Sequence, residues 1–293
     1  MPNCVRLALT IGFLLLSAGC QGRQDVSPGL EPQQEDFARA RKGFKTKLVR
    51  QGPSPQPGNS LQTPSGATEI DYRSGDLILT AFVTPDPGDD RRHPAVLFLH
   101  GGFAFGGDDW DMPQPYRDAG YVVMIPILRG ENGRPGSYTM FYDEVDDVLG
   151  AADCLASLPY VDAKRIFVSG HSAGGTLAML AAMASDRFRA AVSLSGSPDQ
   201  KANAESQPIL ISFDRSDPRE FQLRSPVAYA TSFKCAMRMY FGNQEGWAVV
   251  PTQRTATLAK RNGLDVDAIE VSGDHFSSVP EAIRLSIEFF KLK

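Results

Sequence analysis

The stretch Gly170-His171-Ser172-Ala173-Gly174-Gly175 decides how the rest of this chain is interpreted. The five residues before it, Arg-Ile-Phe-Val-Ser, predict a buried strand, and the residues after it, rich in Ala, Leu and Met, predict a helix. A strand, a G-x-S-x-G turn and a helix in that order are typical of a nucleophile elbow, in which a serine sits on a strained turn. Glycines stand two residues to either side because no Cβ fits there. The pattern therefore predicts Ser172 as a nucleophile, with a structural turn serine as the alternative.

Apolar strands alternate with amphipathic helices along the chain from about residue 67. Strands are expected at 68–72, 77–84, 95–99, 121–125, 165–169, 190–194, 236–241 and 266–271, and helices at 112–119, 141–158, 176–185, 252–261 and 279–290. The first two strands flank Arg73-Ser74-Gly75-Asp76, which predicts an antiparallel hairpin. The alternation that follows predicts an α/β fold: a mostly parallel sheet of about eight strands with helices on both faces. No large cap domain is expected, since 196–234 is the only sizeable insertion.

The composition is that of an ordinary globular protein and narrows the possible partners. The 293 residues carry 30 Lys and Arg against 34 Asp and Glu, and no basic block stands out, so a nucleic-acid partner is not expected. No spacing such as C-x-x-C or H-x-x-x-H occurs, so neither a metal site nor another cofactor is expected. Cys154 and Cys235 are expected to remain two separate buried thiols rather than a disulfide.

The first residues have the layout of an export signal. An apolar run over 7–16, too short to span a bilayer, leads into Ser17-Ala18-Gly19-Cys20. The small residues before Cys20 resemble a bacterial lipoprotein signal, which predicts lipidation of Cys20 and a membrane anchor in the cell envelope. Gln21 after the cysteine favours the outer membrane on its periplasmic side, and a secreted or periplasmic protein is the alternative. The predicted organisation is a signal at 1–20, a flexible Gln-, Pro-, Gly- and Ser-rich tether at 21–66, and one catalytic domain at 67–293. A short helix within 37–49, a stretch with a run of basic residues, is the alternative for that part of the tether.

A serine nucleophile needs a base, and the chain has only four histidines to supply it. His275 follows the last expected strand, and in open parallel sheets the reacting groups gather at the carboxyl ends of strands. His93 precedes a strand and so faces the wrong end, and His100 precedes the nucleophile in the chain. His171 is adjacent to Ser172 and is expected to point away from it. His275 is therefore predicted as the general base.

The acid that orients His275 is expected in the loop after the strand at 236–241. Glu245 is the only carboxylate in that loop, and a longer carboxylate can orient an imidazole if the loop is set back slightly. Glu245 is therefore the predicted acid. Asp274, Asp214 and Asp217 stay open as alternatives, as does a site without any acid.

An acyl-transfer site also needs two preorganised N–H donors for the oxyanion. One is expected from the backbone of Ala173, at the start of the helix after the elbow. The other is expected from the loop His100-Gly101-Gly102-Phe103, where glycines let the backbone approach a substrate, so the donor is Gly102 or Phe103. The alternative for this loop is a plain glycine turn.

With these residues placed, the chain resembles an α/β-hydrolase, most closely the catalytic domain of the prolyl oligopeptidase family and its small esterase and dienelactone hydrolase-like relatives. The resemblance covers about residue 93 to the end and rests on ordered matches: His100-Gly101-Gly102, Gly120-Tyr121-Val122-Val123, Arg129-Gly130, Val161-Asp162, Arg165-Ile166, Gly170 to Gly175, Ser225-Pro226 and Asp274-His275. It implies Ser172 as nucleophile, His275 as base and Glu245, three residues after Gly242, as acid. The family normally has Asp at that position.

The resemblance implies a serine hydrolase that forms an acyl-enzyme at Ser172. Peptidases of the family carry a β-propeller before the hydrolase domain, and here that place holds only the expected tether. An open site favours small acyl substrates, and esters have better leaving groups than amides, so a carboxylic ester hydrolase is expected. The alternatives are a serine peptidase of the prolyl oligopeptidase family acting on short peptides and, more remotely, a non-catalytic envelope lipoprotein that retains the fold.

Overall fold

The computed structural model describes residues 30–293. The predicted signal, the lipidation site Cys20 and the first part of the expected tether lie outside the described residues and stay predictions. Within the described range, none of the helices combines the length and the apolar character needed to cross a bilayer.

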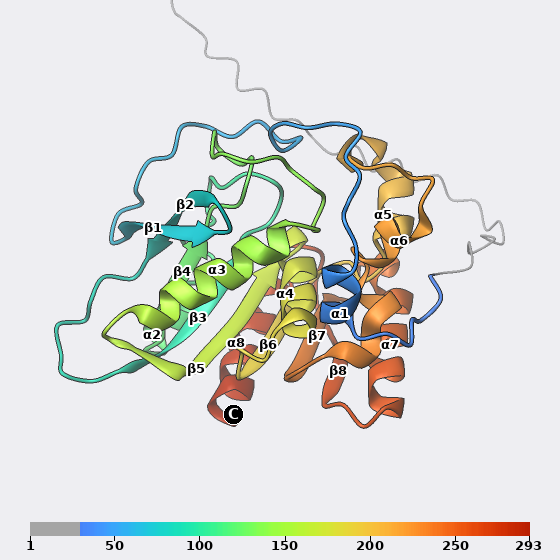
Figure 1. Cartoon of the computed structure of the whole chain (residues 1–293). Helices are drawn as coiled ribbons and strands as arrows, with labels where there is room; N and C mark the ends of the chain where they lie inside the picture. Colours follow the sequence, from blue (N-terminus) through green and yellow to red (C-terminus); the bar gives the residue numbers. More distant parts are fainter. Residues whose placement is uncertain (1–29) are drawn as a thin grey trace, which may run out of the picture.

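An eight-stranded sheet forms the centre of the protein, in the order β1-β2-β4-β3-β5-β6-β7-β8 (Figure 1). The strands are β1 (Thr68–Ser74), β2 (Leu77–Val83), β3 (His93–Leu99), β4 (Val122–Pro126), β5 (Val161–His171), β6 (Ala190–Leu194), β7 (Ala236–Gly242) and β8 (Val266–Val271). β1 and β2 form the predicted antiparallel hairpin, β2 is antiparallel to β4, and the strands from β4 to β8 are parallel. The predicted fold class is confirmed.

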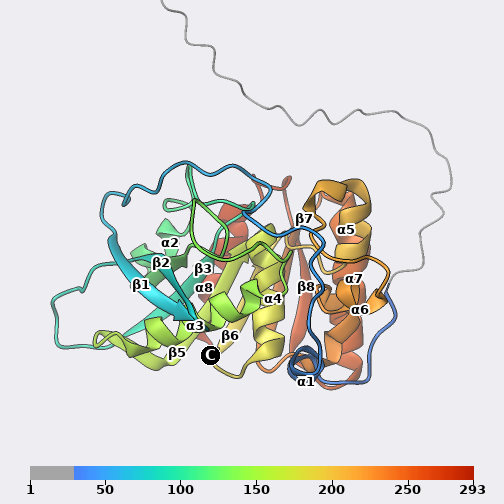
Figure 2. The ribbon, with the colours of Figure 1, turned by 45° about the horizontal axis from the view of Figure 1, so that its top comes forward.

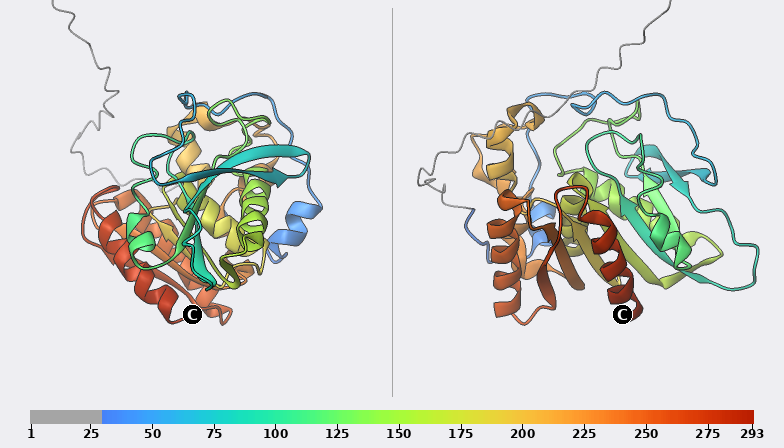
Figure 3. Two further views of the ribbon diagram at one scale, coloured as in Figure 1. Left: turned by 90° about the vertical axis from the view of Figure 1, so that its left-hand side faces the viewer. Right: turned by 180° about the vertical axis from the view of Figure 1, so that it is seen from behind.

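Helices cover both faces of the sheet, as the buried apolar strands require (Figures 1 and 3). The long helices are α3 (Glu144–Ser157), α4 (Ala173–Ala184), α7 (Gly246–Arg261) and α8 (Val279–Lys291), and the short α2 (Gln114–Asp118) lies near α8. Ile166 and Val168 of β5 pack into one core with α3, α4 and α7. Phe167, between them, faces the opposite core, where its ring stacks on Phe290 of α8 at 4.4 Å.

The segment between β6 and β7 folds into short helices that the sequence did not predict. They are α5 (Gln200–Ser206), the 3-10 helix η1 (Pro208–Leu210), α6 (Pro218–Gln222) and the 3-10 helix η2 (Pro226–Ser232). Each is too short to show a clear hydrophobic period. Cys235 follows this segment and, like Cys154, is a free thiol that is partly rather than fully buried.

The described part of the expected tether, residues 30–66, is packed on the domain, which corrects the prediction of a flexible segment. α1 (Phe37–Lys42) buries Phe37 and Ala40 completely, and the Phe37 ring meets Tyr229 edge-on at 5.3 Å. From α1 the chain crosses the upper edge of the sheet to reach β1 (Figures 1 and 2). The average composition was misleading because a few apolar residues and many polar contacts with distant residues hold this segment: Phe37 and Ala40 are buried, and Leu30, Phe44 and Leu48 pack against the same core.

Candidate active site

The turn between β5 and α4 has the strained backbone that the elbow pattern predicts. Ser172 has φ 55° and ψ −115°, a conformation that non-glycine residues rarely adopt, and its N–H donates to the carbonyl oxygen of Leu194 at 2.8 Å. A Cβ on Gly170 would overlap the carbonyl oxygen of Gly174, and a Cβ on Gly174 would overlap the carbonyl oxygen of Leu99. The two glycines are therefore required for the close approach of α4 to the strands.

The structure brings Ser172, His275 and Glu245 together in a line. His275 lies in the loop after β8 and Glu245 in the loop after β7, so the carboxyl ends of three parallel strands supply the group. The Ser172 Oγ is 2.9 Å from His275 Nε2, and His275 Nδ1 is 2.6 Å from Glu245 Oε1. A carboxylate can only accept, so the tautomer that satisfies both contacts carries its proton on Nδ1 and accepts the serine hydroxyl at Nε2.

Glu245 is held as a buried carboxylate by three donors. Only 3% of the residue is exposed, and its second oxygen, Oε2, accepts the Ser195 hydroxyl at 2.5 Å and the Gly242 N–H at 2.7 Å. Burial works against the charged form, but the hydrogen bonds from His275, Ser195 and Gly242 outweigh it and lower the pKa of Glu245. The side chain therefore stands ionised beside the imidazole near neutral pH.

The three alternative acids are engaged elsewhere. The Asp274 carboxylate accepts the Ser277 N–H and hydroxyl within its own turn, and these hydrogen bonds lower its pKa to about 2. Asp214 pairs with Lys47, and Asp217 caps the first turn of α6. None of these carboxylates is hydrogen-bonded to His275 within the described residues, whereas Glu245 is.

Two further residues support the group, and sequence reasoning missed both contributions. Burial, together with the nearby His275, lowers the pKa of His171 to about 4, so its neutral ring donates from Nε2 to the carbonyl oxygen of His275 at 2.8 Å. His171 thus positions the backbone of the predicted base. Ser195, which donates to Glu245, follows β6 directly, and that place after a parallel strand was the one signal that could have identified it.

The loop after β3 places its backbone beside the nucleophile. Gly102 has φ 67°, which favours glycine, and Gly102, Phe103 and Ala173 together line a small pocket next to the elbow. Ala173 is the first residue of α4, so its N–H has no acceptor within the helix. The Phe103 N–H donates to the side-chain oxygen of Gln56 at 3.0 Å. The structure therefore gathers the three predicted oxyanion residues at one place.

A buried ion pair between His100 and Glu131 holds the start of the loop after β3 in place. His100 Nδ1 is 2.9 Å from the Gly101 carbonyl oxygen and Nε2 is 3.0 Å from Glu131 Oε2. Two oxygen acceptors require a doubly protonated imidazolium. In agreement with this, the Glu131 carboxylate overcomes the effect of burial and raises the pKa of His100 to about 9. His100 thus anchors the loop as a cation, while His93 lies at the other end of β3 beside Asp89.

An open pocket of about 410 Å³ gives access to Ser172 and His275, a size within the range of small-molecule sites. The aromatic side chains of Trp247 and Phe276 flank the imidazole, with ring centres 5.9 and 5.2 Å from it, and they are 51% and 67% exposed. Large exposed aromatic rings beside a reactive group suit the apolar part of a ligand. Among residues 30–293, no group of three or more His, Cys, Asp or Glu side chains could hold a metal ion.

Comparison with known proteins shows which families and structures the chain is similar to. Residues 109–241 match the model of the prolyl oligopeptidase family. The chain is 25% identical over 210 residues to an uncharacterized peptidase, YtmA, of Bacillus subtilis, a match that covers 67% of this chain and 77% of that protein.

Solved structures agree on the fold. A puromycin-hydrolyzing peptidase of Mycobacterium tuberculosis superposes with a TM-score of 0.67 at 22% identity, over 78% of this chain but only 40% of that one. A dienelactone hydrolase described as putative, from Klebsiella pneumoniae, superposes with a TM-score of 0.58 at 16% identity, over 78% of this chain and 98% of that one. The chain is thus an α/β-hydrolase that resembles the prolyl oligopeptidase family, and it is a serine hydrolase.

Proposed function

We propose that this serine hydrolase is a peptidase that cleaves short peptides through an acyl-enzyme at Ser172. The observation that carries the proposal is the line from Ser172 Oγ to His275 Nε2 and from His275 Nδ1 to the buried Glu245. The sequence had favoured esters as substrates. The choice of peptides instead is supported by the match to the prolyl oligopeptidase family and by the peptidase YtmA.

In the proposed first step, Ser172 Oγ attacks the substrate carbonyl carbon while its proton passes to His275 Nε2. The carbonyl oxygen becomes an oxyanion that accepts the N–H groups of Ala173 and of Phe103 or Gly102. Glu245 keeps the imidazole in the tautomer that can accept this proton and stabilises the imidazolium that results. The C–N bond then breaks, and His275 returns the proton to the leaving amine.

Water completes the proposed cycle. It enters the pocket, gives a proton to His275 Nε2 and attacks the carbonyl carbon of the ester that joins the acyl group to Ser172. The second oxyanion uses the same donors as the first. Its collapse releases the carboxylic acid, and the proton on His275 returns to Ser172 Oγ.

Ester hydrolysis is the second candidate, and the open pocket supports it. The dienelactone hydrolase match covers 98% of that protein, so a domain of this size is a complete fold among relatives of that kind. The same mechanism applies, with an alcohol as the leaving group.

A substrate panel separates the two candidates. The purified protein would be tested on aminoacyl and dipeptidyl p-nitroanilides and on p-nitrophenyl acetate, with Ser172→Ala as the inactive variant and Ser157→Ala, an exposed serine on α3, as the matched control. Anilide turnover that depends on Ser172 supports the peptidase. Turnover of the ester alone favours the ester hydrolase, and labelling of Ser172→Ala by a fluorophosphonate probe contradicts the role of Ser172 altogether.

A further inference from the structure

The strap, defined as residues 51–59 (Gln-Gly-Pro-Ser-Pro-Gln-Pro-Gly-Asn), crosses the edge of the sheet where the site lies (Figure 2). Gln56 Oε1 accepts the Phe103 N–H at 3.0 Å, and a Cβ built on Gly102 would lie 2.6 Å from the same oxygen. An amide carbonyl oxygen of the chain itself therefore stands where the oxyanion loop offers its N–H. The proposed mechanism assigns this position to the carbonyl oxygen of the substrate.

Asn132 joins the strap to Phe105, two residues after the loop 100–103 that supplies the predicted oxyanion donors. Asn132 donates from Nδ2 to the Asn59 carbonyl oxygen at 3.0 Å and to the Phe105 carbonyl oxygen at 2.8 Å, and its Oδ1 accepts the Phe105 N–H at 2.9 Å. Asn132 itself has φ 46°, a conformation that asparagine tolerates better than most residues. A Cβ on Gly58 would lie 2.7 Å from Asn132 Nδ2, so the strap lies directly against this side chain.

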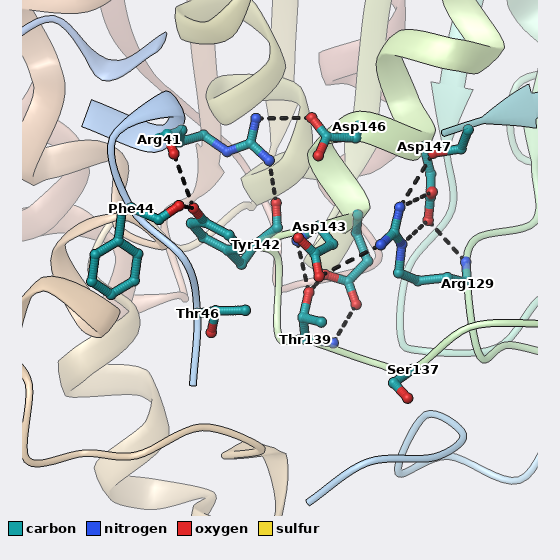
Figure 4. A network of polar contacts seen from close by, with 12 residues as sticks. Arg41, Phe44, Thr46, Arg129, Ser137, Thr139, Tyr142, Asp143, Asp146 and Asp147 are labelled. Atoms are coloured by element: carbon teal, nitrogen blue, oxygen red, sulfur yellow. Dashed lines mark hydrogen bonds and ion pairs between the residues drawn. The ribbon is translucent and has the colours of Figure 1, made fainter. Parts of the chain in front are cut away.

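The chain before the strap is anchored to the domain at several points. Arg41 lies between Asp146, at 3.0 Å, and the Tyr142 carbonyl oxygen, at 2.7 Å, and the Tyr142 hydroxyl donates to the Phe44 carbonyl oxygen (Figure 4).

The next residues bind a fully buried ion pair. The Thr46 hydroxyl and the Lys47 N–H donate to the two carboxylate oxygens of Glu220 at 2.8 and 2.7 Å. Glu220 is paired with Arg224, and neither side chain is exposed to solvent. The path of the chain into the strap is therefore fixed by the interior of the domain.

The strap backbone is stiff, while its Gln56 side chain is free to leave. Prolines at 53, 55 and 57 fix φ at every second residue, and Ser54 donates its N–H to the Gly130 carbonyl oxygen at 3.0 Å. Gln56 is exposed, and its contact with Phe103 is a single hydrogen bond between neutral groups. Its side chain can therefore swing away without disturbing the packed core or the backbone on either side.

We propose that the strap is an autoinhibitory element in which the Gln56 amide occupies the oxyanion site as an internal mimic of the substrate carbonyl. The proposal rests on the proposed roles of Ser172 and Phe103. A substrate must displace Gln56 to bind. The apparent affinity of the enzyme for the substrate is therefore its intrinsic affinity multiplied by the fraction of molecules in which the oxyanion site is free. Removal of the amide lowers KM and leaves kcat nearly unchanged, because the competing contact is absent once the substrate is bound.

The test compares Gln56→Ala with Gln51→Ala, which removes the same side chain from an exposed position of the strap. The readouts are kcat and KM for p-nitrophenyl acetate and the second-order rate constant for fluorophosphonate labelling, each also measured for Ser172→Ala as the inactive reference. For a typical net hydrogen bond, Gln56→Ala is expected to raise kcat/KM and the labelling rate constant about threefold to tenfold, with Gln51→Ala close to wild type.

The possible outcomes distinguish a failure of the autoinhibition proposal from a failure of the proposed catalytic function. Rates for Gln56→Ala within twofold of wild type, or below it, overturn autoinhibition while the proposed function stands. A gain shared equally by Gln51→Ala also overturns it, since the Gln56 carbonyl would then not be the cause. If neither wild type nor Gln56→Ala reacts with the ester or the probe, the proposed function itself fails and the strap proposal falls with it.

Discussion

Replacement of Glu245 by glutamine tests the acid of the site, which is a Glu where the resemblance to the prolyl oligopeptidase family would lead one to expect an Asp. The substitution keeps the size of the side chain but replaces one acceptor oxygen by an NH₂ group. Glu245 Oε2 accepts two donors, the Ser195 hydroxyl and the Gly242 N–H, so the amide oxygen of Glu245→Gln will take that place. The NH₂ group will then face His275 Nδ1, 2.6 Å away in the wild type. It can only donate, so the proton of the imidazole moves to Nε2, which can no longer accept from Ser172.

The expected loss follows from this wrong tautomer. A comparable change in a serine protease triad lowers kcat about 10⁴-fold, and a similar loss here corresponds to about 5 kcal/mol of barrier. The assay is kcat and kcat/KM on the best substrate of the panel, with circular dichroism and urea unfolding to establish that the variant is folded.

Two variants serve as controls for Glu245→Gln. Glu270→Gln makes the same chemical change on an exposed residue of β8 and is expected to behave as wild type. Glu245→Asp keeps the charge and is expected to retain far more activity than Glu245→Gln. A folded Glu245→Gln protein with kcat within about tenfold of wild type refutes the argument, because an ionised partner for His275 would then not be needed.

Three further predictions concern the loop, its ion pair and the N-terminus. Gly102→Ala adds a Cβ at φ 67° that would also displace Gln56, so it is made in the Gln56→Ala background, where it is expected to lower kcat/KM at least about tenfold without loss of fold; steady-state kinetics with circular dichroism check it. His100 has its pKa raised from 6.5 to about 9, so its contribution to stability is complete below pH 6.5 and disappears as the pH rises through about 9. Urea unfolding should therefore show that wild type loses more stability than His100→Asn between about pH 6 and pH 10, and parallel losses would contradict the ion pair. Cys20→Ala should abolish incorporation of labelled palmitate and release the protein from membranes, whereas retained label would contradict lipidation at this residue.

The fold was predictable where a short apolar run ends at turn residues. β6 and β8 were predicted at their observed bounds. β6 is buried along its whole length, as a strand inside a parallel sheet is, whereas β8 lies at the edge, carries Asp267 and Glu270, and is bounded by the turn residues Ser272 and Gly273. α7 begins at Gly246, well before its predicted start at 252. The predicted helix began after Pro251, a residue type that is disfavoured inside helices, but the observed helix contains this proline.

The site was predictable to the extent that it is encoded in local motifs and chain order. Ser172 has a strand, glycines and a helix around it, and His275 and Glu245 each follow a strand on the required side of the nucleophile. The contact between Gln56 and Phe103 links residues 47 apart and depends on a path that α1 and the strap take across the domain. No local pattern marks such a contact, and the proline-rich composition pointed to a linker.

The anchoring of residues 30–59 also has a consequence for the order in which the protein folds. The Phe37 N–H donates to the Ser232 hydroxyl, 195 residues later in the chain, and the Thr46 hydroxyl donates to the Glu220 carboxylate, 174 residues later. Loops of that length close late, and the partners are synthesised long after the segment itself. We expect the sheet and the elbow to assemble first and the N-terminal segment to dock in one of the last folding steps. A newly made molecule would then pass through an interval in which its site is complete and uncovered.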